Sequence, residues 1–316
     1  DLFLSHDLHF ELTLRAFEPG KHVLLEKPMA NTLDEADQMI AAAKKADRVL
    51  AVSENFRFEP AVLKAKEIMD AGDIGEPFMI VVHDWFWMAE ITTVYPPCDW
   101  RRKLDGNAGG VLYDRGVHLA AIIRYLGGEV DTVYARCMNP QKHWEGDETA
   151  LLLITHKNGL VSNYISSWNI LGLTCRETPL FAIYGTEGSI VENAPYRIGG
   201  HGCYEAASLK ITSRKNPTWK GRVVPNELQA GKSWLEDLWQ MEIPPNMLED
   251  MVRHGTEWFV ADAYPDYDVY HASVADFVSA VRGEKEPRVS GQIARDDVAL
   301  VLKAYEADRT NQVVKV

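Results

Sequence analysis

The chain has 316 residues, of which 46% are hydrophobic and 25% charged, and its formal net charge at pH 7 is −13. This composition is typical of a globular protein, and the length suits about two domains. The absence of any apolar run of about 18 residues argues against a membrane span. The acidic balance, without a Lys/Arg tract, argues against nucleic acid and membrane surfaces as partners.

Cysteine usage favours a cytoplasmic protein. The four cysteines, at positions 98, 137, 175 and 203, are far apart and lack metal-ligand spacing. We therefore expect reduced thiols, as in the cytosol. No basic segment followed by an apolar stretch, the mark of a secretory signal, is visible.

Short apolar segments alternate with helical patterns over the first 55 residues, which predicts a parallel sheet with helical crossovers. We expect strands at 1–5, 22–25 and 48–53 and a helix at 8–18. Thr32 and Glu35 have the spacing of a capping box, and apolar residues follow at helical intervals, so a helix is expected from there.

A different pattern begins after a further helix, which starts at Pro60 and runs to about Gly72. Strand-like runs separated by turn residues predict a mainly antiparallel sheet, at 78–87, 132–138, 148–156, 160–168 and 179–186. One helix, at about 111–127, interrupts these strands. The segment 192–250 has no clear period, and helices are expected at 268–282 and 291–309.

The sequence Glu26-Lys27-Pro28 ends an apolar strand with a charged pair. A residue before proline is restricted to extended geometry, which would hold Lys27 at the carboxyl end of a parallel strand, where α/β sheets bind ligands. A lysine there can hydrogen-bond a substrate hydroxyl and stabilise developing negative charge. The alternative is a solvated strand end closed by proline, because most lysines are simply exposed.

Asp114 and His118 lie four residues apart near the start of the helix expected at 111–127. The helix dipole there favours a carboxylate and a neutral imidazole, so His118 could act as a general base near neutral pH. The alternative is an acidic residue at a helix start and a histidine packed in the core.

Other candidates are weaker. Asn55 and Arg57 follow another strand end and could contact a cofactor or substrate at the same rim. His6 and His9 lack the ligand number and the partner carboxylate of a metal site, so no metal is expected. Four aromatic residues could stack on a sugar ring, although such clusters are more often core or interface: Trp85, Phe86, Trp87 and Trp100.

Together these motifs resemble the Gfo/Idh/MocA family of NAD(P)-dependent oxidoreductases. The matching stretches are EKP (26–28), NFRFEP (55–60), WRRKLDGNAGG (100–110), DRGVH (114–118), DETA (147–150), YGTEGSI (184–190) and the closing region from residue 277. The similarity runs nearly end to end and is weakest over 192–265. The order and spacing of the motifs are far more specific than any one of them.

The resemblance implies an α/β fold in two parts. Residues 1–56 would be the C-terminal part of a Rossmann doubly wound parallel sheet that binds NAD or NADP. Residues 57–316 would be a substrate-binding and oligomerisation domain with a large mixed, mainly antiparallel sheet. The family's Gly-rich loop is absent, so an N-terminal truncation of about 60–70 residues is expected, given about 30 residues per βαβ unit. The family also has this Lys-Pro bond often in cis.

The resemblance implies roles for individual residues. Lys27, Asp114 and His118 would be catalytic: Lys27 polarises the substrate oxygen, Asp114 fixes substrate and tunes His118, and His118 serves as acid and base. The implied cofactor contacts are Ser5, His6, His9, Glu26, Lys27, Pro28, Asn55 and Arg57. The implied substrate contacts are Trp100, Arg101, Asp114 and His118.

The function expected from the resemblance is reversible hydride transfer between NAD(P) and a secondary alcohol of a sugar or cyclitol, in a homo-oligomer, dimer or tetramer. Two alternatives stay open: an NAD-dependent glycoside-cleaving enzyme of the same family, acting by oxidation and elimination, and a non-catalytic NAD(P)-binding sensor. The substrate, and the choice between NAD and NADP, are not encoded in any motif of these residues.

Overall fold

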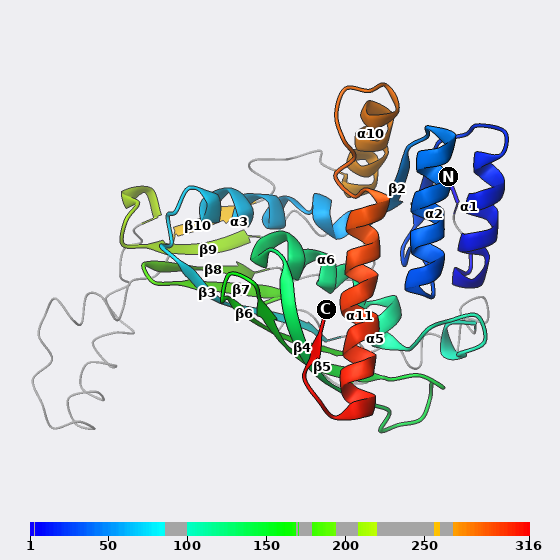
Figure 1. Ribbon diagram of the computed structural model, residues 1–316. Coiled ribbons are helices and arrows are strands. Elements are labelled where there is room, and N and C mark those ends of the chain that lie inside the picture. The colour runs from blue at the N-terminus through cyan, green and yellow to red at the C-terminus, as the bar shows by residue number, and fades with distance from the viewer. Residues whose placement is uncertain are drawn as a thin grey trace, which may run out of the picture.

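The computed structural model describes residues 1–2, 4–85, 100–168, 170, 179–193, 208–219, 256–259 and 268–316. A small α/β unit lies at one end of the molecule and a large sheet at the other (Figure 1). Helix α11 (Gly291–Thr310), orange to red in the figure, runs between them and contacts both.

The small unit alternates helices and parallel strands, as expected of a Rossmann-type fold. Its elements are η1 (His6–Leu8), α1 (His9–Phe17), β1 (Val23–Glu26), α2 (Leu33–Ala46) and β2 (Leu50–Ser53). Strands β1 and β2 pair in parallel. The strand expected over residues 1–5 is a single parallel bridge between Leu2 and Leu25.

The predicted capping box at the start of α2 is confirmed. The Thr32 hydroxyl accepts a hydrogen bond from the Glu35 amide at 3.2 Å, and the Glu35 carboxylate accepts one from the Thr32 amide at 3.0 Å. These two bonds satisfy amide groups that a helix start otherwise leaves without partners.

The large sheet has nine strands in the order β10-β9-β8-β7-β3-β6-β5-β4-β11. Their bounds are β3 (Pro77–Trp85), β4 (Val130–Met138), β5 (Thr149–His156), β6 (Val161–Ser167), β7 (Phe181–Gly185), β8 (Gly188–Asn193), β9 (Ser208–Ser213), β10 (Thr256–Phe259) and β11 (Val314–Lys315). Within this described sheet, β3 and β6 pair in parallel and the other neighbours pair antiparallel. The expected mixed, mainly antiparallel sheet is therefore confirmed.

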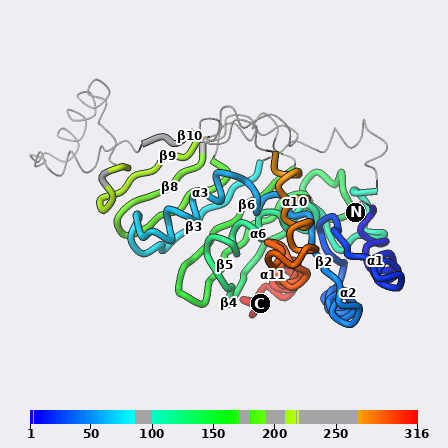
Figure 2. Tube along the Cα trace, turned by 90° about the horizontal axis from the view of Figure 1, so that it is seen from above, coloured from blue at the N-terminus to red at the C-terminus, as the bar shows by residue number. Residues whose placement is uncertain are grey.

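Helices cover one face of this sheet. They are α3 (Pro60–Asp70), α6 (Gly116–Gly127) and α11, seen on one side of the strands in Figures 1 and 2. Residues at alternate positions of β3, Ile80 and Val82, are fully buried beneath them. The last helices, α10 (Val269–Val281) and α11, match the two that the sequence predicts.

The helix expected over 111–127 is two helices, α5 (Val111–Asp114) and α6, separated at Arg115. Gly116 begins α6 close to the Tyr164 hydroxyl, and a Cβ there would lie only 2.8 Å from it. This close approach requires glycine, which is a poor helix former.

Strands β8, β9 and β10 were not expected from the sequence. In β9 the apolar Leu209 and Ile211 alternate with Ser208, Lys210 and Thr212, but two apolar residues are too short a run to predict a strand, and β9 is defined by its pairing with β8. Such short strands depend on neighbours more than on local propensity.

The smaller hydrophobic core combines β1, β2, α1 and α2 with side chains from the C-terminal part of the chain, including Val269, Val289 and Val298. A larger core lies between the nine-stranded sheet and its helices. The division of the chain at residues 56 and 57 stays a prediction.

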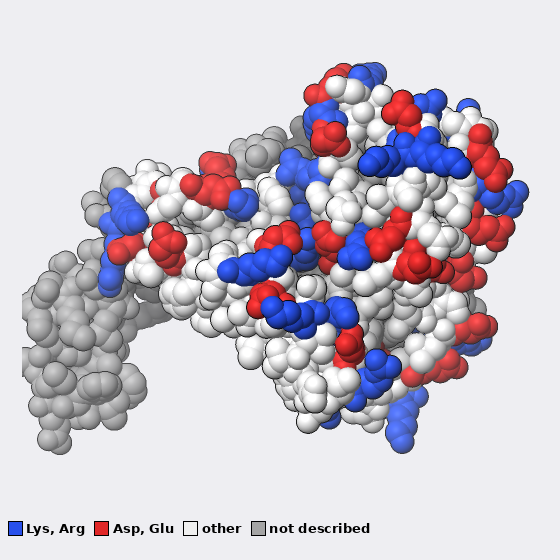
Figure 3. All heavy atoms as spheres, viewed as in Figure 1, with Lys and Arg blue, Asp and Glu red and all other residues white. Residues whose placement is uncertain are grey.

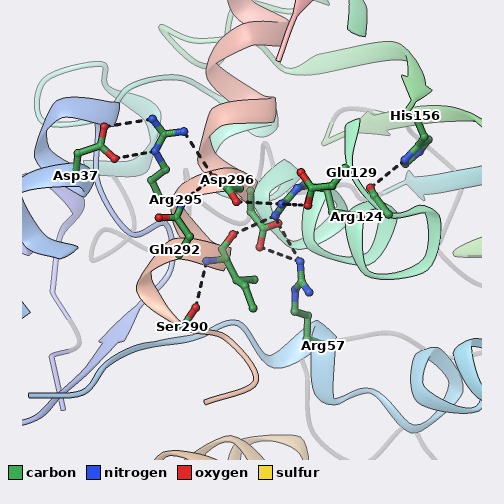
Figure 4. A network of polar contacts seen from close by, with 12 residues as sticks. Asp37, Arg57, Arg124, Glu129, His156, Ser290, Gln292, Arg295 and Asp296 are labelled. Carbon is green, nitrogen blue, oxygen red and sulfur yellow. Dashed lines mark hydrogen bonds and ion pairs between the residues drawn. The ribbon is translucent and has the colours of Figure 1, made fainter. Parts of the chain in front are cut away.

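A network of ion pairs anchors α11 to the elements around it (Figure 4). Arg57 of η2 (Asn55–Phe58) and Arg124 of α6 both donate to Asp297 Oδ1 of α11, at 3.1 and 2.6 Å. Nearer the surface, Arg295 of α11 pairs with Asp37 of α2 at 2.8 Å. Helix α11 is thus anchored to both parts by charge as well as by apolar packing.

Acidic and basic side chains are interspersed over the face of the molecule shown in Figure 3. Among the helices that the structure describes, none is long and apolar enough to cross a membrane. Cys137 is a free thiol, and the other three cysteines lie outside the described residues.

Candidate active site

Segments far apart in the sequence meet at the carboxyl ends of β1 and β2. Lys27 follows β1, Glu54 follows β2, and Asp114 ends α5. The Lys27 ammonium donates to both Asp114 Oδ1 and the Asp114 backbone carbonyl, each at 2.8 Å. In open α/β sheets this edge is where ligands bind. Lys27 and Asp114, for which the resemblance implies separate roles at the substrate, are thus in direct contact with each other.

The Lys27–Pro28 peptide is cis, the form common in the family that the motifs resemble. His9 lies directly behind this segment, with Nδ1 2.8 Å from the Pro28 carbonyl oxygen and Nε2 3.2 Å from the Leu4 carbonyl oxygen. Its side chain is fully buried, so His9 supports the segment from behind.

Asp114 is held by two cations. Arg101 donates to its Oδ2, opposite Lys27 on Oδ1, and His6 Nε2 lies 4.0 Å from Oδ1. Burial alone would raise the pKa of the Asp114 carboxyl, but Lys27 and Arg101 outweigh it and hold the pKa well below its ordinary value. Asp114 is therefore a permanent anion at neutral pH.

His118 has a different partner from the one expected. Its Nδ1 lies 2.6 Å from Oε1 of Glu54, whereas Asp114 is committed to Lys27 and Arg101. Burial, together with the positive charges of Lys27 and Arg115, lowers the pKa of His118 well below its ordinary value. His118 is thus a neutral imidazole at neutral pH, as a general base must be.

Glu54 was missed because the motifs drew attention to Asn55 and Arg57, one and three residues later. The position of Glu54 could have identified it, since it follows β2 as Lys27 follows β1, and neighbouring parallel strands end at one edge. Asn55 is buried in η2, and Arg57 is bound to Asp297. The structure thus places Arg57 in the network that anchors α11.

His6 and Trp100 lie beside Asp114. The rings of His6 and Trp100 meet edge to face with centroids 4.9 Å apart, and the Arg101 guanidinium lies over Trp100 at 4.8 Å. Burial lowers the pKa of His6 to about 3, so this imidazole is also neutral. Trp85 stacks on His83 instead, and Phe86 and Trp87 lie outside the described residues.

A nicotinamide nucleotide suits the polar groups left at this edge. His6 Nδ1 is buried without a hydrogen-bond partner among the described residues. Burial raises the pKa of Glu26 to about 7, although Lys27 opposes the shift. Unmatched buried donors and acceptors are costly unless a ligand pairs with them. The described residues thus fit the nicotinamide end of such a cofactor.

The start of α5 is fixed by Asp147. Its carboxylate accepts hydrogen bonds from the Gly110 and Leu112 amides, both at 2.9 Å, and from the Tyr305 hydroxyl at 2.6 Å. A Cβ at Gly110 would lie 2.0 Å from the Asp147 carbonyl oxygen, so only glycine fits. This clamp orients the helix whose last residue is Asp114.

Comparison with known families identifies the chain. Residues 3–54 match the NAD-binding Rossmann-fold domain of the oxidoreductase family GFO/IDH/MocA, and residues 62–191 match the GFO/IDH/MocA C-terminal domain. The two matches together cover more than half of the chain. The chain belongs to the GFO/IDH/MocA oxidoreductase family.

Curated members of the GFO/IDH/MocA family are also similar to this chain in sequence. A levoglucosan dehydrogenase of Pseudarthrobacter phenanthrenivorans is 31% identical over 219 residues, which cover 61% of this chain and 54% of that protein. A myo-inositol 2-dehydrogenase of Thermotoga maritima is 31% identical over 160 residues, covering 49% of this chain and 45% of that protein. The chain spans about half the length of the curated relatives it matches.

Solved structures agree on the fold. A levoglucosan dehydrogenase in complex with NADH and levoglucosan superposes with a TM-score of 0.77 at 22% identity, over 100% of this chain and 79% of that one. An aldose–aldose oxidoreductase from Caulobacter crescentus, complexed with glycerol, gives 0.75 at 21% identity, over 99% and 78%. The NAD-binding fold inferred from the motifs is confirmed.

Proposed function

We propose that this chain carries the catalytic residues of an NAD(P)-dependent dehydrogenase that oxidises a secondary alcohol of a sugar or cyclitol reversibly. The observation that supports this most is the meeting of Lys27, Asp114 and a neutral His118 at the carboxyl edge of the Rossmann strands. The relatives named above act on levoglucosan and myo-inositol, both polyhydroxylated rings.

Each residue has a distinct role in this proposal. Lys27 donates a hydrogen bond to the substrate oxygen and stabilises the negative charge that develops there. His118 accepts the hydroxyl proton at Nε2. Asp114 holds the Lys27 ammonium in place, and Arg101 and Trp100 border the substrate. When bound, NAD(P) supplies the acceptor for the hydride.

The cofactor would be held from one side by Ser5, His6, Glu26 and Pro28. His6 offers Nδ1, which has no partner among the described residues, and Glu26 offers a buried carboxyl. We assign His9, Asn55 and Arg57 to the support of this edge, because their side chains are buried within the protein.

The test is the absorbance of NADH or NADPH in the natural protein that contains these 316 residues, incubated with either cofactor and a panel of polyols. The panel includes levoglucosan, D-apiose, myo-inositol and aryl glycosides. A rise with a free sugar or cyclitol is expected. Release of an aglycone without a rise would instead indicate a glycoside-cleaving enzyme, and binding of cofactor without any reaction would indicate a sensor.

We further propose a homo-oligomer, dimer or tetramer, in the cytoplasm, where the free thiol of Cys137 would stay reduced. The sheet face opposite the helices carries Met138, Leu151 and Leu153, which are 42%, 36% and 51% exposed. Apolar side chains gathered on an open sheet face favour an interface. Light scattering should give at least a dimer, and Leu153→Glu should lower the mass; a monomeric wild-type protein would contradict the proposal.

A further inference from the structure

Glu54 and His118 form a second buried pair, separate from the pair of Lys27 and Asp114. Nδ1 of His118 lies 2.6 Å from Glu54 Oε1, and the two residues are only 6% and 2% exposed. The Phe56 ring stacks on the imidazole, with centroids 4.5 Å apart and planes 22° apart. The ring is therefore held in one orientation. Its Nε2 makes no hydrogen bond to the residues that the structure describes, which leaves this atom for another molecule.

Only one of the two oxygens of the Glu54 carboxyl is hydrogen-bonded to the backbone. Oε1 also accepts a hydrogen bond from the Phe56 amide at 3.1 Å. Oε2 is buried and has no partner among the described residues. A buried carboxylate oxygen without a partner is costly. This cost falls when the carboxyl takes up a proton, so the geometry favours a group that gains and loses one.

Charged groups from several elements surround this pair and set its charge. They are Glu26 and Lys27 at the end of β1, Arg57 of η2, Asp84 of β3, Asp114 of α5, Arg115 between α5 and α6, and Asp297 of α11. Burial raises the pKa of the Glu54 carboxyl to about 7, although Lys27 opposes this shift. Burial lowers the pKa of His118. Of the two groups, the Glu54 carboxyl is therefore the more readily protonated one.

We propose that Glu54 and His118 work as one acid–base dyad, in which Glu54 is a positioning residue that sets the tautomer of His118 and receives a proton from it. The inference rests on the proposed function. In the active form, Nδ1–H donates to the Glu54 carboxylate, and Nε2 carries the lone pair. When Nε2 binds the substrate hydroxyl proton, the Nδ1 proton passes to Oε1. The imidazole stays neutral, the dyad holds one more proton, and the reverse reaction returns it.

The test is the pH dependence of kcat/KM in wild type and in Glu54→Gln. Glutamine keeps the size of Glu54 and an oxygen for the Phe56 amide, but it cannot take the proton. Wild-type kcat/KM for alcohol oxidation should rise with pH through about 7 and then level off, because the dyad must lose its extra proton to act. In Glu54→Gln it should fall about 10²- to 10⁴-fold and lose this rise.

A lower rate that keeps the same rise would overturn the proposal, because it would give Glu54 only a structural role. An unchanged rate would overturn it as well.

Glu26→Gln is the matched control. Glu26 is the other carboxyl at this edge whose pKa burial raises to about 7, but no bond joins it to His118 in the described structure. The rise in kcat/KM near neutral pH should persist in Glu26→Gln. If it disappears there and persists in Glu54→Gln, Glu26 is the titrating group and the dyad is refuted.

A second measurement needs no activity and no variant of Glu54. Ring-nitrogen chemical shifts of isotope-labelled histidine, with His118 assigned by its loss in His118→Asn, report the tautomer directly. The wild-type protein above its titration should show His118 protonated on Nδ1. Protonation on Nε2 instead would contradict the dyad. If the Nδ1 form is found but no polyol is oxidised, the dyad stands and the proposed function fails.

Discussion

The molecule contains two buried aspartates that are each held by two cations, and they lie in different surroundings. Asp114 lies between Lys27 and Arg101 at the carboxyl edge of the Rossmann strands. Asp297 lies between Arg57 and Arg124, inside the contact between α11 and its neighbours (Figure 4). The same arrangement of charges thus occurs at a candidate active site and at a junction of the fold.

The difference lies in what borders each carboxylate. Beside Asp114 lie His6, whose buried Nδ1 has no partner in the described structure, and His118, whose pKa burial lowers. The ion-pair partners of Asp297 are two arginines, which stay protonated at any physiological pH. A buried ion pair by itself is weak grounds for function. Neighbouring histidines with shifted pKa values are the better sign of a site that binds and reacts.

Removing Asp297 should have the largest effect on folding. Asp297→Ala leaves the guanidinium groups of Arg57 and Arg124 buried without their carboxylate. Losing one partner of a buried ion pair costs about 3–5 kcal/mol. Urea unfolding should show this loss. The control is Asp37→Ala, which removes an exposed ion pair of the same helix α11 and should cost no more than about 1 kcal/mol. Equal losses in the two variants would contradict a special role for Asp297.

Changing Lys27 should lower turnover and leave the stability of the fold nearly unchanged. Lys27→Met removes the donor to the substrate oxygen, and turnover should fall about 10²- to 10³-fold, as for loss of a single oxyanion donor. Stability should change little, because Asp114 keeps Arg101. The control is Lys21→Met, at an exposed position before β1. Unchanged turnover in Lys27→Met would remove Lys27 from the proposed mechanism.

The smallest effect on stability should come from the capping box of α2, which lies neither beside Asp114 nor beside Asp297. Thr32→Ala removes the acceptor for the Glu35 amide and should lower the free energy of unfolding by about 1 kcal/mol. Thr32→Ser retains the hydroxyl and should retain most of the stability. A fall in turnover larger than the fall in stability would show that α2 is coupled to the site.

Local patterns in the sequence predicted local structure well. The capping box at Thr32, the helix start at Pro60 and the two last helices follow from chemistry within a few residues. The motifs of the family named Lys27 and Asp114 as candidate site residues, and the structure shows the contact between them.

Contacts between distant segments were not predictable in the same way. Arg57 and Asp297 are 240 residues apart, so nothing near Arg57 indicates that its charge is already paired. His118 and its partner Glu54 are 64 residues apart, and no local pattern near either residue indicates that contact. Sequence placed the site, and the tertiary contacts decided which residues pair within it.

The most direct test of the central claim follows the hydride itself. The natural protein would be incubated with NAD or NADP and with sugars and cyclitols that carry deuterium on their carbinol carbons, and the reduced cofactor would be analysed by mass spectrometry. The proposed function requires that the reduced cofactor gain deuterium, and that Lys27→Met slow this gain. Consumption of the labelled polyol with no deuterium in the cofactor would contradict hydride transfer at this site.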